Sequence, residues 1–175
     1  HCPTCSACSS VRVLAQEFIE TKSHKRKLNK AKTRFEVKYS NQERPQYYAL
    51  YSKYISLRHQ DGSMYPPDKT QFQSFLLCSW LNITFIELWD QDNLVAVAVT
   101  DCMDKAISAI YTFFDPDYEQ YSLGTVMILQ QLIFAKAQNK HYVYLGYQID
   151  ECPKMNYKTQ FLPAQKQVKD QWLTI

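Results

Sequence analysis

Apolar residues recur at helical spacing in three parts of the chain. Between residues 46 and 58 they follow one another at intervals of three and four positions, which predicts an amphipathic helix. The same spacing predicts a shorter helix over residues 69–80 and a longer helix that begins near Ser122. Pro66 and Pro67 break the chain between the first two helices.

Runs of β-branched and aromatic residues predict the strands. Residues 83–89, 94–100 and 106–114 are separated by short polar connections, so we expect three consecutive strands in an antiparallel meander. The first six residues of the second run are all apolar, which predicts a central strand covered on both faces. A short strand over residues 34–39 should precede the meander, and a strand over residues 141–149 should follow the last helix.

The order of these elements predicts the fold class. A connection from strand through helix to strand normally gives parallel pairing, so the strand at 141–149 should lie parallel to an earlier one. An antiparallel meander followed by a parallel crossover is the order found in the acyltransferase fold called GNAT. We therefore predict an α+β protein with a GNAT-like (acyl-CoA N-acyltransferase-like) mixed sheet flanked by helices.

The composition indicates one soluble domain. With 175 residues, of which 46% are hydrophobic, the chain can fill one core but is short for two. It contains no signal peptide and no apolar run of about 18 residues, so we expect no membrane span and no membrane partner. Three of the six cysteines lie within the first eight residues and Cys78 falls in an apolar segment expected to be core, which favours a reducing cytoplasm over a disulfide framework.

A basic block stands out against a net charge of only +3. Its side chains can neutralise several phosphates of a nucleic acid, although such charge runs are also common on solvated surfaces. The block consists of Lys22, Lys25, Arg26, Lys27, Lys30, Lys32 and Arg34.

Cys2, Cys5 and Cys8 have the spacing that lets neighbouring thiolates bind one soft metal ion. Zinc and an iron-sulfur cluster both fit this pattern, with a fourth ligand from His1, Cys152 or a segment that precedes the cluster. The alternative interpretation is that the three thiols bind nothing.

The three glycines of the chain each fall in a segment with candidate chemistry. Gly124 opens the last helix, where free backbone N–H groups can hold an anion, although a tight helix start explains it equally well. The residues before Gly124 lack the glycine-rich loop of acetyl-CoA users, which argues against acetyl-CoA as a cofactor. Gly146 interrupts a strand, as happens where a backbone approaches a ligand closely. Gly62 follows the first helix.

Beyond Gly146 the chain carries a short polar turn, where Cys152, Lys154, Tyr157 and Lys158 fall close together. This stretch and several earlier segments together resemble the arginyl-tRNA-protein transferase family, which includes the bacterial aspartate/glutamate leucyltransferases. In chain order, the segments that carry the resemblance are residues 2–8 with Val11-Arg12-Val13, residues 54–59 with Asp61-Gly62, residues 111–116, residues 122–124 and residues 142–161.

The chain departs from the family pattern at two points. Position 148 is usually aromatic in the family and is Gln148 here. Members of the family carry a longer amino-terminal segment, so we expect the chain, which begins with His1, to be a piece of a longer protein. By the same resemblance, residues 1–40 should end an amino-terminal Cys-rich and basic subdomain, and residues 41–175 should form the GNAT-like aminoacyl-transferase domain.

The resemblance implies an aminoacyl-tRNA-protein transferase. Such an enzyme moves an amino acid, with leucine favoured here, from its tRNA to the α-amino group of proteins that begin with Asp or Glu. The added residue marks the acceptor for degradation in the N-degron pathway. The implied partners are an aminoacyl-tRNA and proteins with acidic amino termini, the chemistry requires no cofactor, and the oligomeric state stays open.

The resemblance and the local chemistry together give the candidate site residues. Tyr147 and Gln148 are candidate catalytic groups, and His59 or Asp61 would accept the proton of the amine. The alternative is that Arg58, His59 and Asp61 only cap a helix before Gly62. The expected substrate-binding residues are Arg58, Tyr111, Gly124, Gly146, Lys154, Tyr157 and Lys158, and the expected tRNA-binding residues are Lys25, Arg26, Lys27 and Lys30.

Two other functions stay open. One is arginyl transfer to the same acceptors, which would need an acidic pocket that the sequence does not single out from Asp90, Asp101, Asp115 and Glu151. The other is a non-catalytic, metal-dependent nucleic-acid-binding module built around the amino-terminal cysteines.

Overall fold

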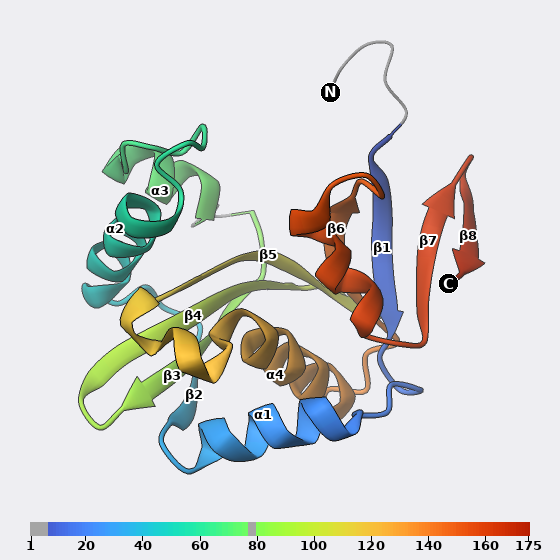
Figure 1. The fold of residues 1–175 in the computed structure, drawn as a ribbon, viewed down its shortest axis with the longest axis horizontal. Helices are drawn as coiled ribbons and strands as arrows, with labels where there is room; N and C mark the ends of the chain where they lie inside the picture. Colours follow the sequence, from blue (N-terminus) through green and yellow to red (C-terminus); the bar gives the residue numbers. More distant parts are fainter. Residues whose placement is uncertain (1–6, 77–79) are drawn as a thin grey trace.

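The computed structural model describes residues 7–76 and 80–175, with the side chains of residues 153 and 154 excepted. The described residues form one mixed sheet with helices on both faces (Figure 1). The strands are β1 (Ser9–Leu14), β2 (Glu36–Ser40), β3 (Ile83–Asp90), β4 (Asn93–Cys102), β5 (Ala106–Phe114), β6 (Tyr142–Gln148), β7 (Ala164–Val168) and β8 (Gln171–Thr174). The helices are α1 (Lys22–Lys32), α2 (Gln46–Arg58), α3 (Lys69–Leu76), α4 (Leu123–Ala137) and the 3-10 helices η1 (Pro116–Tyr121) and η2 (Pro153–Gln160).

The strand order is β2-β3-β4-β5-β6-β1-β7-β8. The predicted meander is confirmed, because β3, β4 and β5 pair antiparallel in sequence order. The predicted crossover is also confirmed: α4 connects β5 to β6, and these two strands are parallel. The α+β class with a mixed sheet is therefore correct.

The local predictions hold where periodicity is strong. Helix α2 has the predicted bounds, and α3 begins at the predicted residue and ends at Leu76. The predicted continuation to Trp80 crosses residues 77–79, which lie outside the described part of the chain, as does the expectation for Cys78. Strand β4 is buried from Leu94 to Thr100, as expected for a central strand covered on both faces.

The sequence did not predict β1, α1, β7, β8 or the 3-10 helix η1. The basic block forms most of α1, which begins at a capping box in which the Thr21 hydroxyl accepts from the His24 N–H. Of the eleven residues of this helix, only His24, Leu28 and Ala31 are buried and anchor it to the core. Its charged residues lie on the side away from the core. Whether residues 1–40 end a separate subdomain stays a prediction, and their described part contributes β1, α1 and β2 to the common sheet and core.

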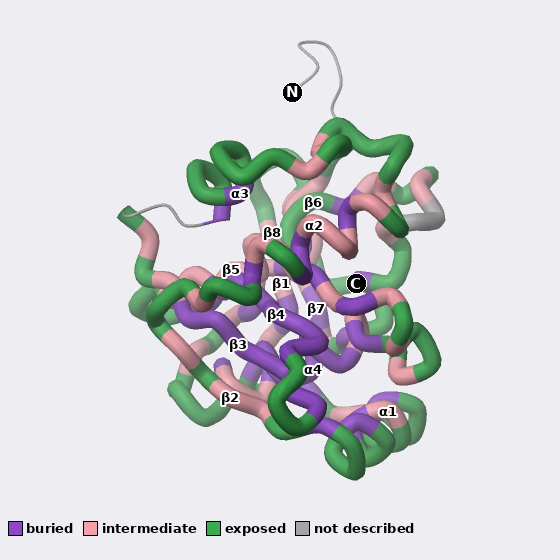
Figure 2. Tube along the Cα trace, turned by 90° about the vertical axis from the view of Figure 1, so that its left-hand side faces the viewer, coloured by how far each residue is buried: buried purple, intermediate pink, exposed green. Residues whose placement is uncertain are grey.

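The core lies in two layers, one on each face of the sheet. Helices α1 and α4 cover one face, where Leu28 and Leu129 pack against Val143 and Leu145 of β6. Helices α2 and α3 cover the other face at the end formed by β3, β4 and β5. Figure 2 shows the buried residues concentrated along β3 and β4 and on α4. No helix among the described residues is long and apolar enough to cross a membrane.

A buried carboxylate fastens α2 to the sheet. Glu87 of β3 has no exposed surface and accepts hydrogen bonds from Arg44 Nε at 2.6 Å, from Trp89 Nε1 at 2.8 Å and from the Tyr47 hydroxyl. A buried charge is tolerated only when such donors replace water. Burial and the adjacent Glu87 raise the pKa of Tyr47 far above its usual value, so this phenol remains a donor.

Strands β5 and β6 separate after three residue pairs, the last of which is Ser108 with Tyr144. Just beyond this point each strand carries an irregularity. On β5, Ile110 is the extra residue opposite β4, and on β6 the register with β1 shifts between Tyr144 and Gly146. Bulges bend a strand away from its neighbour, so these two explain why the sheet opens here.

We predict that Gly146→Ala destabilises the protein by about 1–2 kcal/mol, because Gly146 has a φ of +78° that other L-residues adopt only with strain. Gly124→Ala is the control: its added methyl group would lie at an ordinary 3.6 Å from the Phe114 ring, and alanine favours a helix by up to about 1 kcal/mol. Chemical denaturation of both variants measures the difference. Equal stabilities would show that the backbone at Gly146 relaxes freely.

Candidate active site

A cavity of about 570 Å³ lies where β5 and β6 separate. Ser108 and Ile110 of β5 form one wall, and Tyr144 and Gly146 of β6 form the opposite wall. Phe75 of α3 also lines it, so the cavity opens on the sheet face that carries α2 and α3. The volume is within the usual range for small-molecule sites, about 300–1,000 Å³.

A buried lysine stands at the Gly146 end of the cavity. Lys158 of η2 is only 7% exposed, and its ammonium group donates a hydrogen bond to the carbonyl oxygen of Tyr147. A methyl group added to Gly146 would lie 3.9 Å from Lys158 Nζ. Burial lowers the pKa of Lys158. The predicted association of Gly146, Tyr147 and Lys158 is therefore seen in the structure, whereas their roles stay predictions.

Three tyrosines from different elements, none of which lines the cavity, interact with one another next to Phe75, whose ring centroid lies 6.3 Å from that of Tyr111. Burial raises the pKa of Tyr111 on β5, and the neighbouring hydroxyls of Tyr54 and Tyr51 raise it further. Burial also raises the pKa of Tyr157 on η2 and that of Tyr54 on α2; Arg58 lowers the pKa of Tyr54 and the Tyr157 phenol raises it further. The three phenols consequently stay protonated and are suited to donate hydrogen bonds.

The residues at the end of α2 lie beside this tyrosine group. The backbone N–H of His59 caps the helix on Ile55, and the His59 ring centroid lies 4.9 Å from that of Tyr54. Arg58 donates to Glu119 Oε1 at 3.3 Å on the surface and lies 5.5 Å from the Phe114 ring centroid. The capping interpretation and the functional one are thus compatible, since the backbone caps while the side chains extend toward Tyr54. Asp61 is exposed on the turn that follows.

The remaining predicted site residues are more scattered. Gln148 is 4% exposed and donates from Nε2 to Asp150 at 3.1 Å, while its buried Oε1 accepts no hydrogen bond from the described residues. Tyr147 is 48% exposed at the end of β6. Gly124 lies next to Phe114 at the start of α4, and it does not line the cavity. Lys154 belongs to η2, but its side chain lies outside the described part of the chain.

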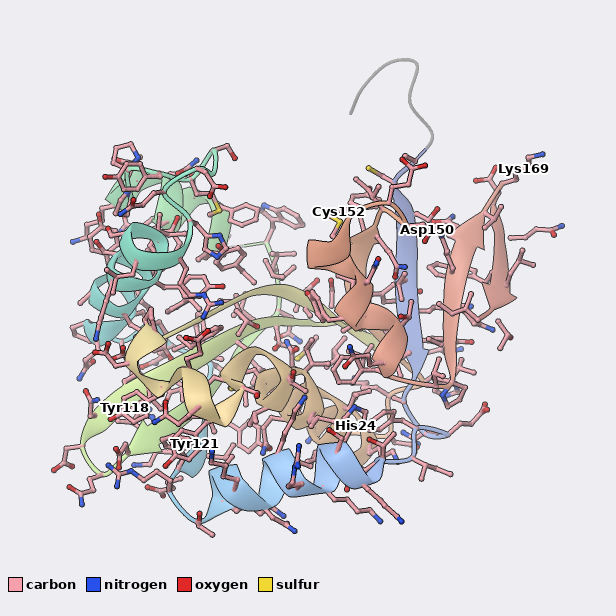
Figure 3. The ribbon with its side chains drawn as sticks, viewed as in Figure 1. His24, Tyr118, Tyr121, Asp150, Cys152 and Lys169 are labelled. Carbon is pink, nitrogen blue, oxygen red and sulfur yellow. The ribbon has the colours of Figure 1, made fainter. Side chains whose placement is uncertain are left out.

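The basic residues expected to bind tRNA lie on the other face of the sheet. Lys25, Arg26 and Lys30 are exposed on α1, Lys27 is half-buried there, and Lys30 donates to the Gln120 carbonyl at 2.8 Å. Figure 3 shows His24 of α1 with Tyr118 and Tyr121 of η1 on the side of the molecule opposite Cys152, which precedes η2. The structure therefore does not bring α1 to the cavity.

The metal prediction falls largely outside the described residues, which exclude Cys2 and Cys5. Cys8 is an exposed free thiol. Within residues 7–76 and 80–175, no group of three or more His, Cys, Asp or Glu side chains is placed to hold a metal ion.

Arg12, to which the sequence assigned no role in the site, holds Tyr144 in one wall of the cavity. Its guanidinium carbon lies 3.9 Å from the ring centroid of Tyr142 and 4.0 Å from that of Trp172, a double cation–π contact. Arg12 also donates to the Tyr144 hydroxyl at 3.2 Å and to Gln165 Oε1 at 2.8 Å. Only the resemblance drew attention to Arg12, because neither β1 nor β8 was predicted.

Comparisons with known proteins agree with one another. The family model described as "Arginine-tRNA-protein transferase, C terminus" matches residues 46–168. The chain is 43% identical over 175 residues to an aspartate/glutamate leucyltransferase of Aeromonas hydrophila, covering 100% of this chain and 73% of the relative. It is 49% identical over 174 residues to the enzyme of the same name in Vibrio campbellii, covering 98% and 73%.

Two solved structures have a similar fold at low sequence identity. The structure of L-PGS from Bacillus licheniformis has a TM-score of 0.61 at 9% identity, over 80% of this chain and 46% of that one. A DUF2156 domain from Agrobacterium fabrum has a TM-score of 0.60 at 11% identity, over the same shares. Such low identities establish a shared fold alone.

We predict that Lys158→Met lowers stability at neutral pH by at most about 1–3 kcal/mol, because the Tyr147 carbonyl loses its hydrogen-bond donor while the removal of a buried charge offsets part of that loss. The lowered pKa of Lys158 means that the unfolded wild type binds more protons than the folded form just below pH 10.5. The wild type should therefore gain stability relative to the variant as pH rises through that range. Urea unfolding across this range tests it.

The matched control for this experiment is Lys169→Met, on the exposed β7–β8 turn. A stability difference between wild type and Lys158→Met that stays constant with pH would contradict the assignment of a buried, charged Lys158.

Proposed function

The chain belongs to the arginine-tRNA-protein transferase family, and from this membership we propose that it transfers leucine from leucyl-tRNA to proteins that begin with Asp or Glu. Membership makes the protein an aminoacyltransferase that acts on an aminoacyl-tRNA and a protein. The choice of leucine and of acidic acceptors follows the names of relatives 43–49% identical to the chain. The added leucine would mark the acceptor for degradation.

The structural observation that carries the proposal is the cavity between β5 and β6. The reaction breaks the ester C–O bond to the ribose and forms an amide C–N bond to the acceptor. The attacking amine loses a proton to a base, the carbonyl oxygen needs hydrogen-bond donors while it carries negative charge, and the ribose oxygen gains a proton as it leaves. A site that positions both substrates next to protonated donors meets these needs without a covalent intermediate.

The candidate groups for these requirements come from β5, β6, η2 and the end of α2, and none of them lines the cavity itself. The phenols of Tyr111 and Tyr157 stay protonated and can donate to the carbonyl oxygen or the ribose oxygen. Tyr147, half exposed at the end of β6, is a further donor. We assign proton acceptance from the amine to His59 or Asp61, at the end of α2. An α-amine has an ordinary pKa of about 7.7–8.0, so a weak base suffices.

The fold we propose for this chemistry is GNAT-like. An antiparallel meander, a parallel crossover and a division between the crossover strands support that assignment. Acetyl-CoA does not enter the proposal, because the segment before Gly124 lacks a glycine-rich loop. Zinc or an iron-sulfur cluster at Cys2, Cys5 and Cys8 stays a prediction without a part in the reaction.

The tRNA would place only its aminoacylated end in the cavity. Because α1 lies on the opposite face, we assign its basic residues to the phosphate backbone of the tRNA body, where contacts add affinity without reading sequence.

The test of the function is incubation with a mixed pool of aminoacyl-tRNAs and with peptides that begin with Asp, Glu, Lys or Ala, read by mass spectrometry. We expect a mass increase of one leucine on the Asp and Glu peptides alone. Arginine on the same peptides would assign arginyl transfer instead. Binding of tRNA without any transfer would favour a non-catalytic nucleic-acid-binding module.

We predict that Arg58→Lys lowers transfer to Asp- and Glu-starting peptides by about 1.5–3 kcal/mol of transition-state binding, the scale of a charged hydrogen bond. Arg58 lies at the end of α2 near Tyr54 and can exchange its surface partner Glu119 for a substrate carboxylate, which a lysine cannot grip with the same two-pronged geometry. Asn-starting peptides serve as the internal control. The same Asp-over-Asn preference in wild type and variant would exclude Arg58 from acid recognition.

A further inference from the structure

The walls of the cavity combine apolar side chains with one acidic group. Phe75, Leu81, Met103 and Ile110 contribute apolar surface. Among the described residues that line the cavity, Asp101 is the single carboxylate. A mostly apolar pocket with one fixed charge suits a ligand that is itself mostly apolar and carries one opposite charge.

The other acidic candidates are committed elsewhere or distant from this cavity. Asp90 binds Arg34 at 2.6 Å and accepts from the Tyr118 hydroxyl at 2.9 Å. Asp115 forms an ion pair with Lys53 at 2.7 Å. Glu151 is exposed on the turn before η2 and does not line the cavity. Of the four acidic residues among which the sequence could not choose, Asp101 is therefore the one that lines the cavity.

Asp101 is positioned to bind a cation in the cavity. It lies near the end of β4, half-buried, and pairs across the sheet with Ser108, which also lines the cavity. Its Oδ1 accepts the backbone N–H of Asn82 at 3.1 Å, which fixes the carboxylate. An ionised carboxylate has about four acceptor positions, so one such hydrogen bond leaves room for an ammonium group.

We propose that this cavity binds the aminoacyl group of the donor tRNA, with Asp101 pairing the α-ammonium and Phe75, Met103 and Ile110 covering an aliphatic side chain. The inference rests on the proposed function and specifies its donor site. A leucyl group carries one cation, which one lining carboxylate neutralises. An arginyl group carries two, and its guanidinium would be buried without a partner, which is costly.

Pairing with Asp101 also separates the two amines of the reaction. The donor's own α-amine stays protonated beside a carboxylate and is therefore no nucleophile, while the acceptor amine outside this pocket gives up its proton and attacks. The enzyme thus distinguishes two chemically similar amines by where each one lies.

The first experiment compares leucyl-tRNA with N-acetyl-leucyl-tRNA, which lacks the ammonium charge. We expect wild type to bind and use leucyl-tRNA at least about tenfold better, as a charged hydrogen bond implies, and Asp101→Asn to lose most of this preference. Asp104→Asn, an exposed carboxylate on the following turn that does not line the cavity, is the matched control and should keep the preference.

The second experiment adds one negative charge to the lining of the cavity. Met103 is 39% exposed, so Met103→Glu should fold and place a second carboxylate at the cavity. We expect the ratio of arginyl to leucyl transfer to rise about tenfold or more, because the guanidinium gains a partner.

The outcomes separate the inference from the proposed function. Transfer of leucine with an unchanged acetyl preference in Asp101→Asn and an unchanged ratio in Met103→Glu would overturn the inference and leave the function standing. Binding of leucyl-tRNA that depends on Asp101, without any transfer, would overturn the function and support the donor site. Failure of the wild type to bind leucyl-tRNA would overturn both.

Discussion

The separation of β5 and β6 after Ser108 and Tyr144 is the constraint on which the rest of the site depends. Two neighbouring parallel strands would normally satisfy each other's backbone groups along their length. Once they diverge, the freed groups need other partners, and the Tyr147 carbonyl finds the ammonium of Lys158. That contact holds η2 against the end of β6, and it places a buried cation next to Gly146, which lines the cavity that the divergence creates.

The two faces of the sheet have different tasks. On one face, apolar residues of α4 and α1 pack against Val143 and Leu145 and so fix the position of β6. On the other face α2 and α3 stop short of β6, so Phe75 borders a cavity rather than a filled core. The hydrogen bonds from Arg44 and Tyr47 to Glu87 fix the start of α2 on β3, and Arg12, stacked between two rings, fixes Tyr144 in the cavity wall. Polar contacts therefore anchor both α2, which covers this face of the sheet, and Tyr144, which lines the cavity.

The charges around the cavity divide the proposed reaction into two halves. Asp101 and the apolar residues that line the cavity lie where β4 pairs with the first half of β5, and there we place the aminoacyl group of the donor. Arg58 and His59 lie at the end of α2 beside Tyr54, where we place the acidic acceptor. Between them the phenols of Tyr111 and Tyr157 remain protonated. Acyl transfer needs little more than this, because the ester is already activated and positioning supplies much of the rate.

The sequence by itself determined the elements whose burial repeats with a regular period, such as α2, the apolar β4 and the crossover from β5 to β6. It also brought Gly146 and Lys158 into one site, because they are close along the chain. Helix α1 was missed because three buried residues are hidden among charges. Only the tertiary structure shows that Asp101, of the four acidic candidates, lines the cavity, and that Arg12 binds Tyr144. It also shows that the basic helix α1 lies on the face of the sheet opposite the cavity. Those arrangements depend on contacts between residues far apart in the chain, which no local periodicity records.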